Sequence, residues 1–277
     1  MQYFWLLLLG LTVGSFGTLI GAGGGFLLMP ILLLAFPNRE PASLTAISLA
    51  VVFFNATSGS YSYAKMKRVD FRSGLLFLLT GVPGAVAGAY VVRYVPRHVF
   101  DFVFGLFLLA GGFLVFVRTL GVSGHKHQSG PTFARDFVDA DEIRHIYGYN
   151  LTLGMSLSFA VGLVSSLLGI GGGIIHVPAM VNMLSFPVHV ATATSHFVLA
   201  VMAMAGTVVH MIDGTLGWAE LPKLLPLAAG AVIGARAGAH MSRRVGGHWI
   251  MRSLAVALGL VGLRILVSAI VAFLSPP

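Results

Sequence analysis

The sequence predicts an all-α polytopic membrane protein made of two homologous halves, with helices that are broken by glycine. Three observations carry this prediction: the abundance of apolar residues, their spread over the whole chain, and a glycine-rich motif that occurs twice. Of the 277 residues, 57% are hydrophobic and only 9% are charged, and the mean hydropathy is +0.90. Water-soluble domains usually have about a quarter of their residues charged, so this composition excludes one.

Apolar segments long enough to cross about 30 Å of hydrocarbon occur along the whole chain. The first of them lacks the positive region and the small-residue cleavage site of a signal peptide, so we interpret it as a membrane span. Each half also has one short apolar segment directly after its glycines. The long segments are expected at 2–20, 43–63, 73–92, 99–117, 150–168, 191–211, 224–241 and 249–273, and the short ones at 25–36 and 173–184.

An internal repeat divides the chain into two halves. The stretch GSFGTLIGAGGGFLLMP, which begins at Gly14, aligns with GLVSSLLGIGGGIIHVP, which begins at Gly162. TAISL and GAVAGA in the first half are matched in the same order by TATSH and GAVIGA in the second. Repeated landmarks in one order predict a first transmembrane repeat at 1–118, a polar linker loop at 119–149 and a second transmembrane repeat at 150–277.

The relative orientation of the halves depends on the two short segments. If both cross the membrane, each half has five hydrophobic segments and the halves are inverted repeats. If both are re-entrant, each half has four spans and the halves are parallel. The five-segment arrangement collects more of the lysines and arginines on one side of the membrane than the four-span arrangement does, and positive charge marks the cytoplasmic side. The charge pattern therefore favours inverted repeats, with the parallel arrangement as the alternative.

Charge and cysteine content exclude several other classes of protein. The net charge is +8, but the basic residues are scattered over loops and helix ends and form no stripe that nucleic acid would need. The chain has no cysteine, which excludes disulfides and thiolate metal sites. His125, His127 and His145 in the linker lack a metal-ligand spacing and are expected in a solvated loop. We therefore predict no cofactor and no metal.

The glycine clusters GAGGG and GIGGG interrupt otherwise apolar helices. Each glycine costs roughly 1 kcal/mol relative to alanine inside a helix, so the backbone is expected to break there. A break inside hydrocarbon leaves backbone groups unpaired unless protein, water or a ligand satisfies them. The following helix then directs free N–H groups and a positive dipole end toward an anion, with close helix packing as the alternative role. The predicted site glycines are Gly23, Gly24, Gly25, Gly171, Gly172 and Gly173.

These motifs resemble the TauE/SafE family of bacterial sulfite and organosulfonate exporters. The similarity includes both glycine motifs, TAISLAVVFFNATSGSYSY with the basic KMKRVDF after it, and TATSHFVLAVMAMAGTVVH, and it covers nearly the whole chain. It implies a carrier of small sulfur oxyanions in the bacterial inner membrane. The longer linker with GHKHQSG, and His196 where the first half has Leu49, depart from the family pattern.

Polar groups inside the predicted spans are candidates for binding the anion, because such groups are costly in lipid and usually functional. His196 is the strongest candidate, since it lies in the repeat motif beside two hydroxyls. Each hydroxyl has the alternative of bonding its own helix, and Arg236 either holds the anion or extends to the membrane surface. Asp101 and Arg264 are expected to be structural. The candidates are Asn55, Thr57, Ser58, His176, Thr194, Ser195, His196 and Arg236.

The sequence as a whole favours a secondary transporter that binds its anion at glycine-broken helix N-termini near the midplane and works by alternating access. Carboxylates are almost absent from the spans, and the membrane potential alone favours anion efflux, so a uniporter suffices. An anion-conducting channel is the alternative, and an enzyme is disfavoured by the absence of a catalytic motif. The expected partners are a sulfur anion such as sulfite, thiosulfate or an organosulfonate, and membrane lipid; a homodimer is left open.

Overall fold

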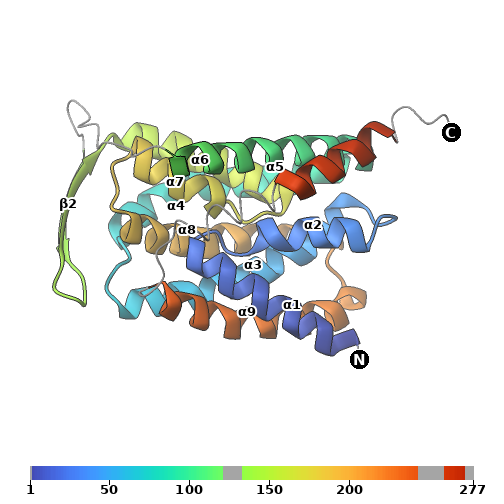
Figure 1. The fold of residues 1–277 in the computed structure, drawn as a ribbon, viewed down its shortest axis with the longest axis horizontal. Coiled ribbons are helices and arrows are strands. Elements are labelled where there is room, and N and C mark those ends of the chain that lie inside the picture. The colour runs from blue at the N-terminus through green and yellow to red at the C-terminus, as the bar shows by residue number, and fades with distance from the viewer. Residues whose placement is uncertain (1, 121–132, 243–258, 272–277) are drawn as a thin grey trace.

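The computed structural model describes residues 2–120, 133–242 and 259–271, which form a helical bundle with one β-hairpin. In Figure 1 the helices run along the long axis, with the hairpin at one end and the N-terminus toward the other. The first half contains α1 (Gln2–Ile20), α2 (Gly25–Ala35), α3 (Pro41–Lys65), α4 (Phe71–Val91), η1 (Val92–Tyr94) and α5 (Arg97–Leu120). The second contains α6 (Leu151–Leu168), α7 (Gly173–Met183), α8 (Val188–Ile212), η2 (Trp218–Glu220), α9 (Leu221–Met241) and a helix at Gly259–Val271.

Every apolar segment expected from the sequence corresponds to a helix, and the structure thus confirms a multi-pass helical membrane protein. Six helices in the described ranges are long and apolar enough to cross a membrane: α1, α3, α4, α6, α8 and α9. The short helices α2 and α7 have 11 residues each, about 16 Å, and neither crosses about 30 Å of hydrocarbon alone. The start of the expected segment 249–273, and the linker residues His125 and His127, lie outside the described residues.

The described loops gather at the two ends of the bundle. The hairpin end consists of loop 66–70, the hairpin and loop 184–187, because Ala140 N donates to Met66 O at 3.0 Å and the rings of Tyr147 and Phe186 lie 4.5 Å apart. The opposite end, called the loop end, consists of loops 36–40, 92–96 and 213–220. It is joined by ion pairs of Arg39 with Glu220 and of Arg93 with Asp213.

Two helix pairs, each with one member from each half, form the outer parts of the bundle. α1 packs along α9 and α6 packs along α4, whereas α3 and α8 pack on each other between them. Glycine makes these contacts close: a Cβ at Gly84 or Gly88 would collide with backbone carbonyls of α6, and one at Gly230 or Gly234 with carbonyls of α1. These four glycines form two Gly-x-x-x-Gly pairs, which in membrane helices typically serve close helix packing, as they do here.

The expectation of an all-α chain with a linker loop is wrong for residues 133–149. They form an antiparallel hairpin of β1 (Phe133–Val138) and β2 (Arg144–Tyr149), in which Phe133 pairs with Tyr149 and Val138 with Arg144. The burial of β1 alternates residue by residue, as in a strand with one covered face. Phe133, Arg135 and Phe137 share the less exposed face of β1, and both phenylalanines pack against the bundle, although the linker as a whole is polar.

Candidate functional site

Both glycine clusters interrupt their helices as the sequence predicted. Gly23 and Gly24 have φ of 72° and 80°, and Gly171 and Gly172 have φ of 77° and 51°, in the left-handed region that favours glycine. Ala22 N and Gly23 N both donate to Gly17 O, so the chain turns back and α2 lies alongside the helix that precedes it. All residues of the two clusters are buried.

The turns leave backbone donors unused inside the protein. In the first cluster the amides of Gly24, Gly25 and Phe26 make no hydrogen bond to any residue that the structure describes. In the second cluster, the amides of Gly171, Gly172 and Ile174 likewise have no described acceptor. Buried amides are almost always paired, and these six lie at the positive ends of α2 and α7. They are therefore suited to receive an anion.

The two glycine clusters touch each other. A Cβ on Gly25 would lie 2.7 Å from the carbonyl carbon of Ile170, and a Cβ on Gly173 would lie 2.5 Å from Ala22 Cα and collide with Gly21 O. The helix N-termini of the two halves therefore meet in the interior, where only glycine allows the backbones this close. One anion placed between them would be within reach of donors from both halves.

His196 on α8 lies beside these clusters and is fully buried. Its Nε2 is 3.3 Å from Thr18 Oγ1, and its ring packs edge-on against Tyr63 at 5.6 Å. A Cβ on Gly59 would lie 2.6 Å from His196 Cδ2, so that glycine makes room for the ring. His196 Nδ1 makes no hydrogen bond of acceptable geometry to a described residue, although the backbone of Thr192 and Gly21 is nearby.

The serines at corresponding positions of the two halves behave differently. Ser48 Oγ on α3 donates to Gly169 O at 2.6 Å, which ties α3 to the second glycine cluster. Its counterpart Ser195 on α8 is equally buried, and its hydroxyl has no partner in the described part of the chain. The hydroxyl of Thr45, whose Oγ1 would be 3.3 Å from a Cβ on Gly169, is also buried without a described partner.

Asn55 and Ser58 on α3 make structural contacts. Asn55 Oδ1 accepts from Thr18 Oγ1 at 3.0 Å, and its Nδ2 donates to Ala231 O at 3.4 Å. Ser58 Oγ donates to Val232 O at 2.9 Å. Both side chains thus bind α3 to the backbone of α9, and Asn55 also orients the Thr18 hydroxyl that faces His196.

The remaining candidates are separated from this centre or already bonded. His176 Nε2 lies 3.2 Å from Ser158 Oγ, beside the ring of Phe77. Thr194 Oγ1 accepts from Asp70 N at 2.9 Å at the hairpin end. Thr57 and Arg236 are exposed, so the structure does not bring them to the glycine clusters. Asp101 is bonded locally, to Arg97 at 2.8 Å, as expected.

Sequence reasoning missed Thr18, Tyr63, Thr45 and Ser48. Thr18 lies three residues before the first glycine cluster, and Ser48 aligns with the candidate Ser195, so both could have been found from the repeat. Tyr63 carried no such signal, since its hydroxyl reaches Thr18 O, 45 residues away, only in the folded bundle. Among the described residues no group of histidines and carboxylates could hold a metal, and the side chains next to the glycine clusters are uncharged.

A charged cluster fastens the hairpin to the bundle. The carboxylate of Asp70, which is fully buried at the N-terminus of α4, accepts two bonds of 2.8 Å from Arg135 and one of 2.6 Å from Tyr147. Burial alone would raise the pKa of Asp70, but the hydrogen bonds from Arg135, Ser73 and Tyr147 outweigh it and hold this pKa below its ordinary value. Burial also raises the pKa of Tyr149, to about 12.

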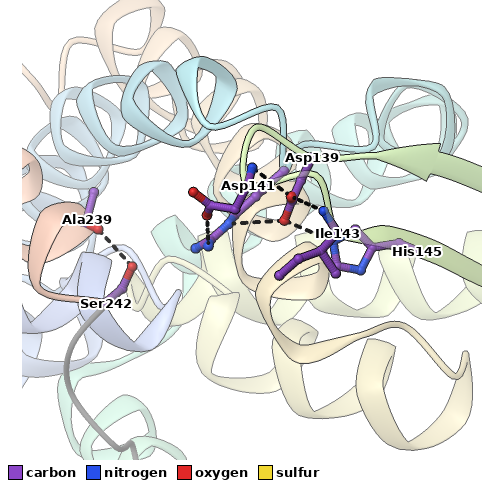
Figure 2. Close-up of polar contacts among 7 residues, drawn as sticks. Asp139, Asp141, Ile143, His145, Ala239 and Ser242 are labelled. Carbon is purple, nitrogen blue, oxygen red and sulfur yellow. Dashed lines mark hydrogen bonds and ion pairs between the residues drawn. The ribbon is translucent and has the colours of Figure 1, made fainter.

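The turn of the hairpin is held by a second set of contacts. Figure 2 shows Asp139 accepting from the amides of Asp141 and Ile143, with its other oxygen 3.1 Å from His145 Nε2. Arg68 from loop 66–70 is buried and donates to Asp141 at 2.8 Å. His145, which was expected in a solvated loop, is only 10% exposed, because the unforeseen strand carries it against the bundle.

Comparison with known proteins agrees with this architecture. The family described as sulfite exporter TauE/SafE matches residues 6–265, nearly the whole chain. The protein belongs to the TauE/SafE family. The match spans both glycine clusters and every helix of the site, so the TauE/SafE assignment rests on the same residues as the geometry.

Several TauE/SafE-like relatives carry transporter names. The chain is 33% identical over 276 residues to the "Probable membrane transporter protein YunE" of Bacillus subtilis, covering 98% of this chain and 99% of that one. It is 25% identical over 273 residues to the "Probable membrane transporter protein MJ0441" of Methanocaldococcus jannaschii, covering 94% of each. No solved structure matches the chain. Membrane transport is therefore the function class that the relatives share.

Proposed function

We propose that this protein is a secondary transporter that exports small sulfur oxyanions, such as sulfite, thiosulfate or organosulfonates, across the inner membrane. The observation that carries the proposal is the meeting of two buried helix N-termini whose amides at Gly24, Gly25, Gly171 and Gly172 have no described acceptor. A sulfite or sulfonate group offers three oxygens, which three or more such donors can share. The family to which the chain belongs is described as sulfite exporters.

The side chains around the clusters complete the proposed anion site. Ser195 Oγ and His196 Nδ1 are buried on α8, whose Thr192 and Leu199 side chains lie against the first glycine cluster. Neither atom has a hydrogen bond of acceptable geometry in the described ranges, so we assign both as donors to the anion. Thr18 and Tyr63 hold His196 in place from α1 and α3. A site of neutral donors and helix dipoles binds an anion without a fixed cation that would hold it too tightly for release.

We also propose that the halves are inverted repeats, although neither short helix crosses the membrane alone. α2 returns to the end of the bundle where α1 begins, and α7 to the end where α6 begins, so each half starts and finishes at opposite ends, as it would with five spans. Gly230 and Gly238 of α9 face Leu7 and Ser15 of α1 in the same order, so these helices run parallel, and α1 begins at the loop end where α9 begins. α6 begins at the hairpin end, directly after β2. Equivalent helices of the two halves therefore enter the bundle from opposite ends, as in transporters with inverted repeats.

The burial of the proposed site supports alternating access. Both glycine clusters are closed off from solvent, so an anion reaches them only when the bundle opens toward one end. The tight pairs α1–α9 and α4–α6 are suited to move as units, with α3 and α8 between them. The hairpin end is assigned to the cytoplasm, since it carries more basic residues than the loop end. Among the described residues those of the hairpin end include Lys65, Lys67, Arg68, Arg72, Arg135, Arg144 and Arg236, and those of the loop end include Arg39, Arg93, Arg97 and Lys223.

The membrane potential is sufficient to drive this export. With the cytoplasm negative, moving one negative charge outward releases about 2.3 kcal/mol per 100 mV. The spans contain almost no carboxylates for a proton relay, so we propose uniport.

Reconstitution into proteoliposomes tests the proposal. Uptake of radiolabelled sulfite is measured at a potential clamped with potassium and valinomycin, with protein-free liposomes as the blank and labelled acetate as the control anion. We expect saturable, potential-dependent sulfite flux that does not need a proton gradient. A flux that requires a proton gradient at fixed potential would reject uniport, whereas a flux that never saturates would indicate a channel. The absence of any sulfur-anion flux would reject the substrate class.

A further inference from the structure

A pocket of about 600 Å³ lies at the hairpin end between α3 and α9, away from the glycine clusters. It is lined by Tyr61, Ser62, Lys65, Met66, Arg236 and His240. One turn from the lining residue Ser62, Ser58 Oγ donates to Val232 O at 2.9 Å and joins α3 to α9, while Ser62 Oγ donates to Ser58 O at 3.0 Å within α3. A volume of this size suits a small ligand or a headgroup.

The positive charge of the pocket is not neutralised by the described residues. Lys65 and Arg236 make no ion pair with any carboxylate in the described ranges, whereas Arg39, Arg93 and Arg97 at the loop end all have one. Lys65 instead lies over the ring of Tyr61, with Nζ 4.6 Å from its centroid. Two unpaired cations that converge on one cavity, with a histidine beside them, indicate an anionic ligand.

The surfaces next to the pocket are apolar and face outward. Phe54, Tyr61 and Lys65 lie on one face of α3, and the rings of Phe54 and Tyr61 are 40% and 58% exposed. Ile233, Arg236 and His240 lie on one face of α9, and Ile233 is 55% exposed. On both helices the apolar residue lies toward the middle of the bundle and the basic residue near its end. This is the order of acyl chain and headgroup in a lipid at the membrane surface.

We propose that this pocket binds the phosphate headgroup of an anionic phospholipid, with Lys65 and Arg236 on the phosphate and the acyl chains along Phe54, Tyr61 and Ile233. The exposed apolar strip favours a lipid over a free anion, because a free phosphate or sulfite would use only the basic end. The site is separate from the proposed sulfite site and does not depend on the transported anion. It gives Arg236, which lies far from the glycine clusters, a ligand of its own.

Thermal unfolding of the purified full-length protein in detergent tests the lipid site. Phosphatidylglycerol and phosphatidylcholine with the same acyl chains are added in turn, and we expect phosphatidylglycerol to raise the Tm more. In K65Q/R236Q this difference disappears, while Lys223→Gln retains it. Lys223 is the matched control, because its Nζ lies 4.8 Å over the Phe36 ring at the loop end. One basic residue near an anionic surface contributes about 1 kcal/mol, so each substitution should weaken phosphatidylglycerol binding about fivefold.

Equal stabilisation by the two lipids, or a double variant that keeps the difference, would overturn the proposal. So would inorganic phosphate that reproduces and competes with the effect of phosphatidylglycerol, because the pocket would then bind a free oxyanion. The transition of each variant in phosphatidylcholine reports whether it is folded. If the double variant does not fold, native mass spectrometry of Arg236→Gln alone decides, with loss of retained phosphatidylglycerol supporting the site and full retention refuting it.

Discussion

His196 on α8 and Thr18 on α1 face each other in the interior of the bundle, with Nε2 3.3 Å from Oγ1. The contact joins the two halves of the sequence, because Thr18 lies three residues before the first glycine cluster and His196 lies in the repeat motif of the second half. The first half has Leu49 where the second has His196, so this imidazole makes the site asymmetric.

Replacing His196 by leucine, the residue of the first half, should strongly reduce anion transport without unfolding the protein. The site is buried and already lined by apolar groups, so leucine fits the volume. A hydrogen bond to a charged ligand is worth about 1.5–3 kcal/mol, so we expect sulfite flux to fall about tenfold or more. Thr57→Val, at an exposed position of α3, is the control and should transport normally. Normal flux in H196L would remove His196 from the site.

Alanine at Gly25 or Gly173 should destabilise the protein, because its Cβ would overlap the opposite glycine cluster. Overpacking of this kind costs about 1–3 kcal/mol. The matched control is Gly111→Ala in α5, where nothing lies within 4 Å of an added Cβ and helix propensity should stabilise by up to about 1 kcal/mol. The measurement is thermal unfolding in detergent. If Gly25→Ala and Gly111→Ala raise the Tm alike, the two clusters do not touch.

Acid should release the hairpin. The pKa of Asp70 is lower in the folded protein than in the unfolded chain, so its stabilisation is complete above about pH 4, the unfolded value, and is lost as the pH falls through the folded value. Protonation leaves Arg135 without its counter-charge. Limited proteolysis within 133–149 at decreasing pH measures the release, with Asp70→Asn as the variant in which the hairpin is already released at neutral pH. Identical pH profiles for the two proteins would contradict this assignment.

Arg97 should stabilise the end of α2. Its guanidinium donates to Leu33 O at 3.0 Å and Arg39 O at 2.7 Å, and it also pairs with Asp101. Arg97→Gln should lower the free energy of unfolding by about 2 kcal/mol, since free helix carbonyls and a partly buried carboxylate lose their partner. Arg93→Gln removes a half-exposed cation 3.5 Å from Asp213 and should cost less than about 1 kcal/mol. Chemical denaturation of both variants compares them, and equal losses would argue against the capping role.

The helices were predictable because their signals are local. Long apolar runs predicted α1, α3, α4 and the corresponding helices of the second half. The glycine clusters, which interrupt a helix, predicted the starts of α2 and α7 at Gly25 and Gly173. The strands were missed because a polar linker predicts a loop, whereas the aromatic residues of the hairpin pack against the bundle.

The site was predictable in part. Alignment of the two halves identified the glycines, which are shared, and His196, which differs from its counterpart Leu49. The position of the Arg236 side chain could not be predicted. A basic residue near a helix end can point into the bundle or extend to the membrane surface, and the packing of the neighbouring helices decides between the two. Tyr63 and Thr18 meet only through packing, which no local pattern records.

The crossed helix pairs bear on how such a protein arose. α1 of the first half packs along α9 of the second, and α6 of the second half packs along α4 of the first, with rows of glycine that bring the backbones into contact. A single ancestral half would have exposed its glycine-rich helix face to lipid. A second copy in the opposite membrane orientation would have covered that face. On the inverted arrangement that we propose, two oppositely oriented subunits would precede the fused gene, and the linker with its hairpin would be the later joint between them.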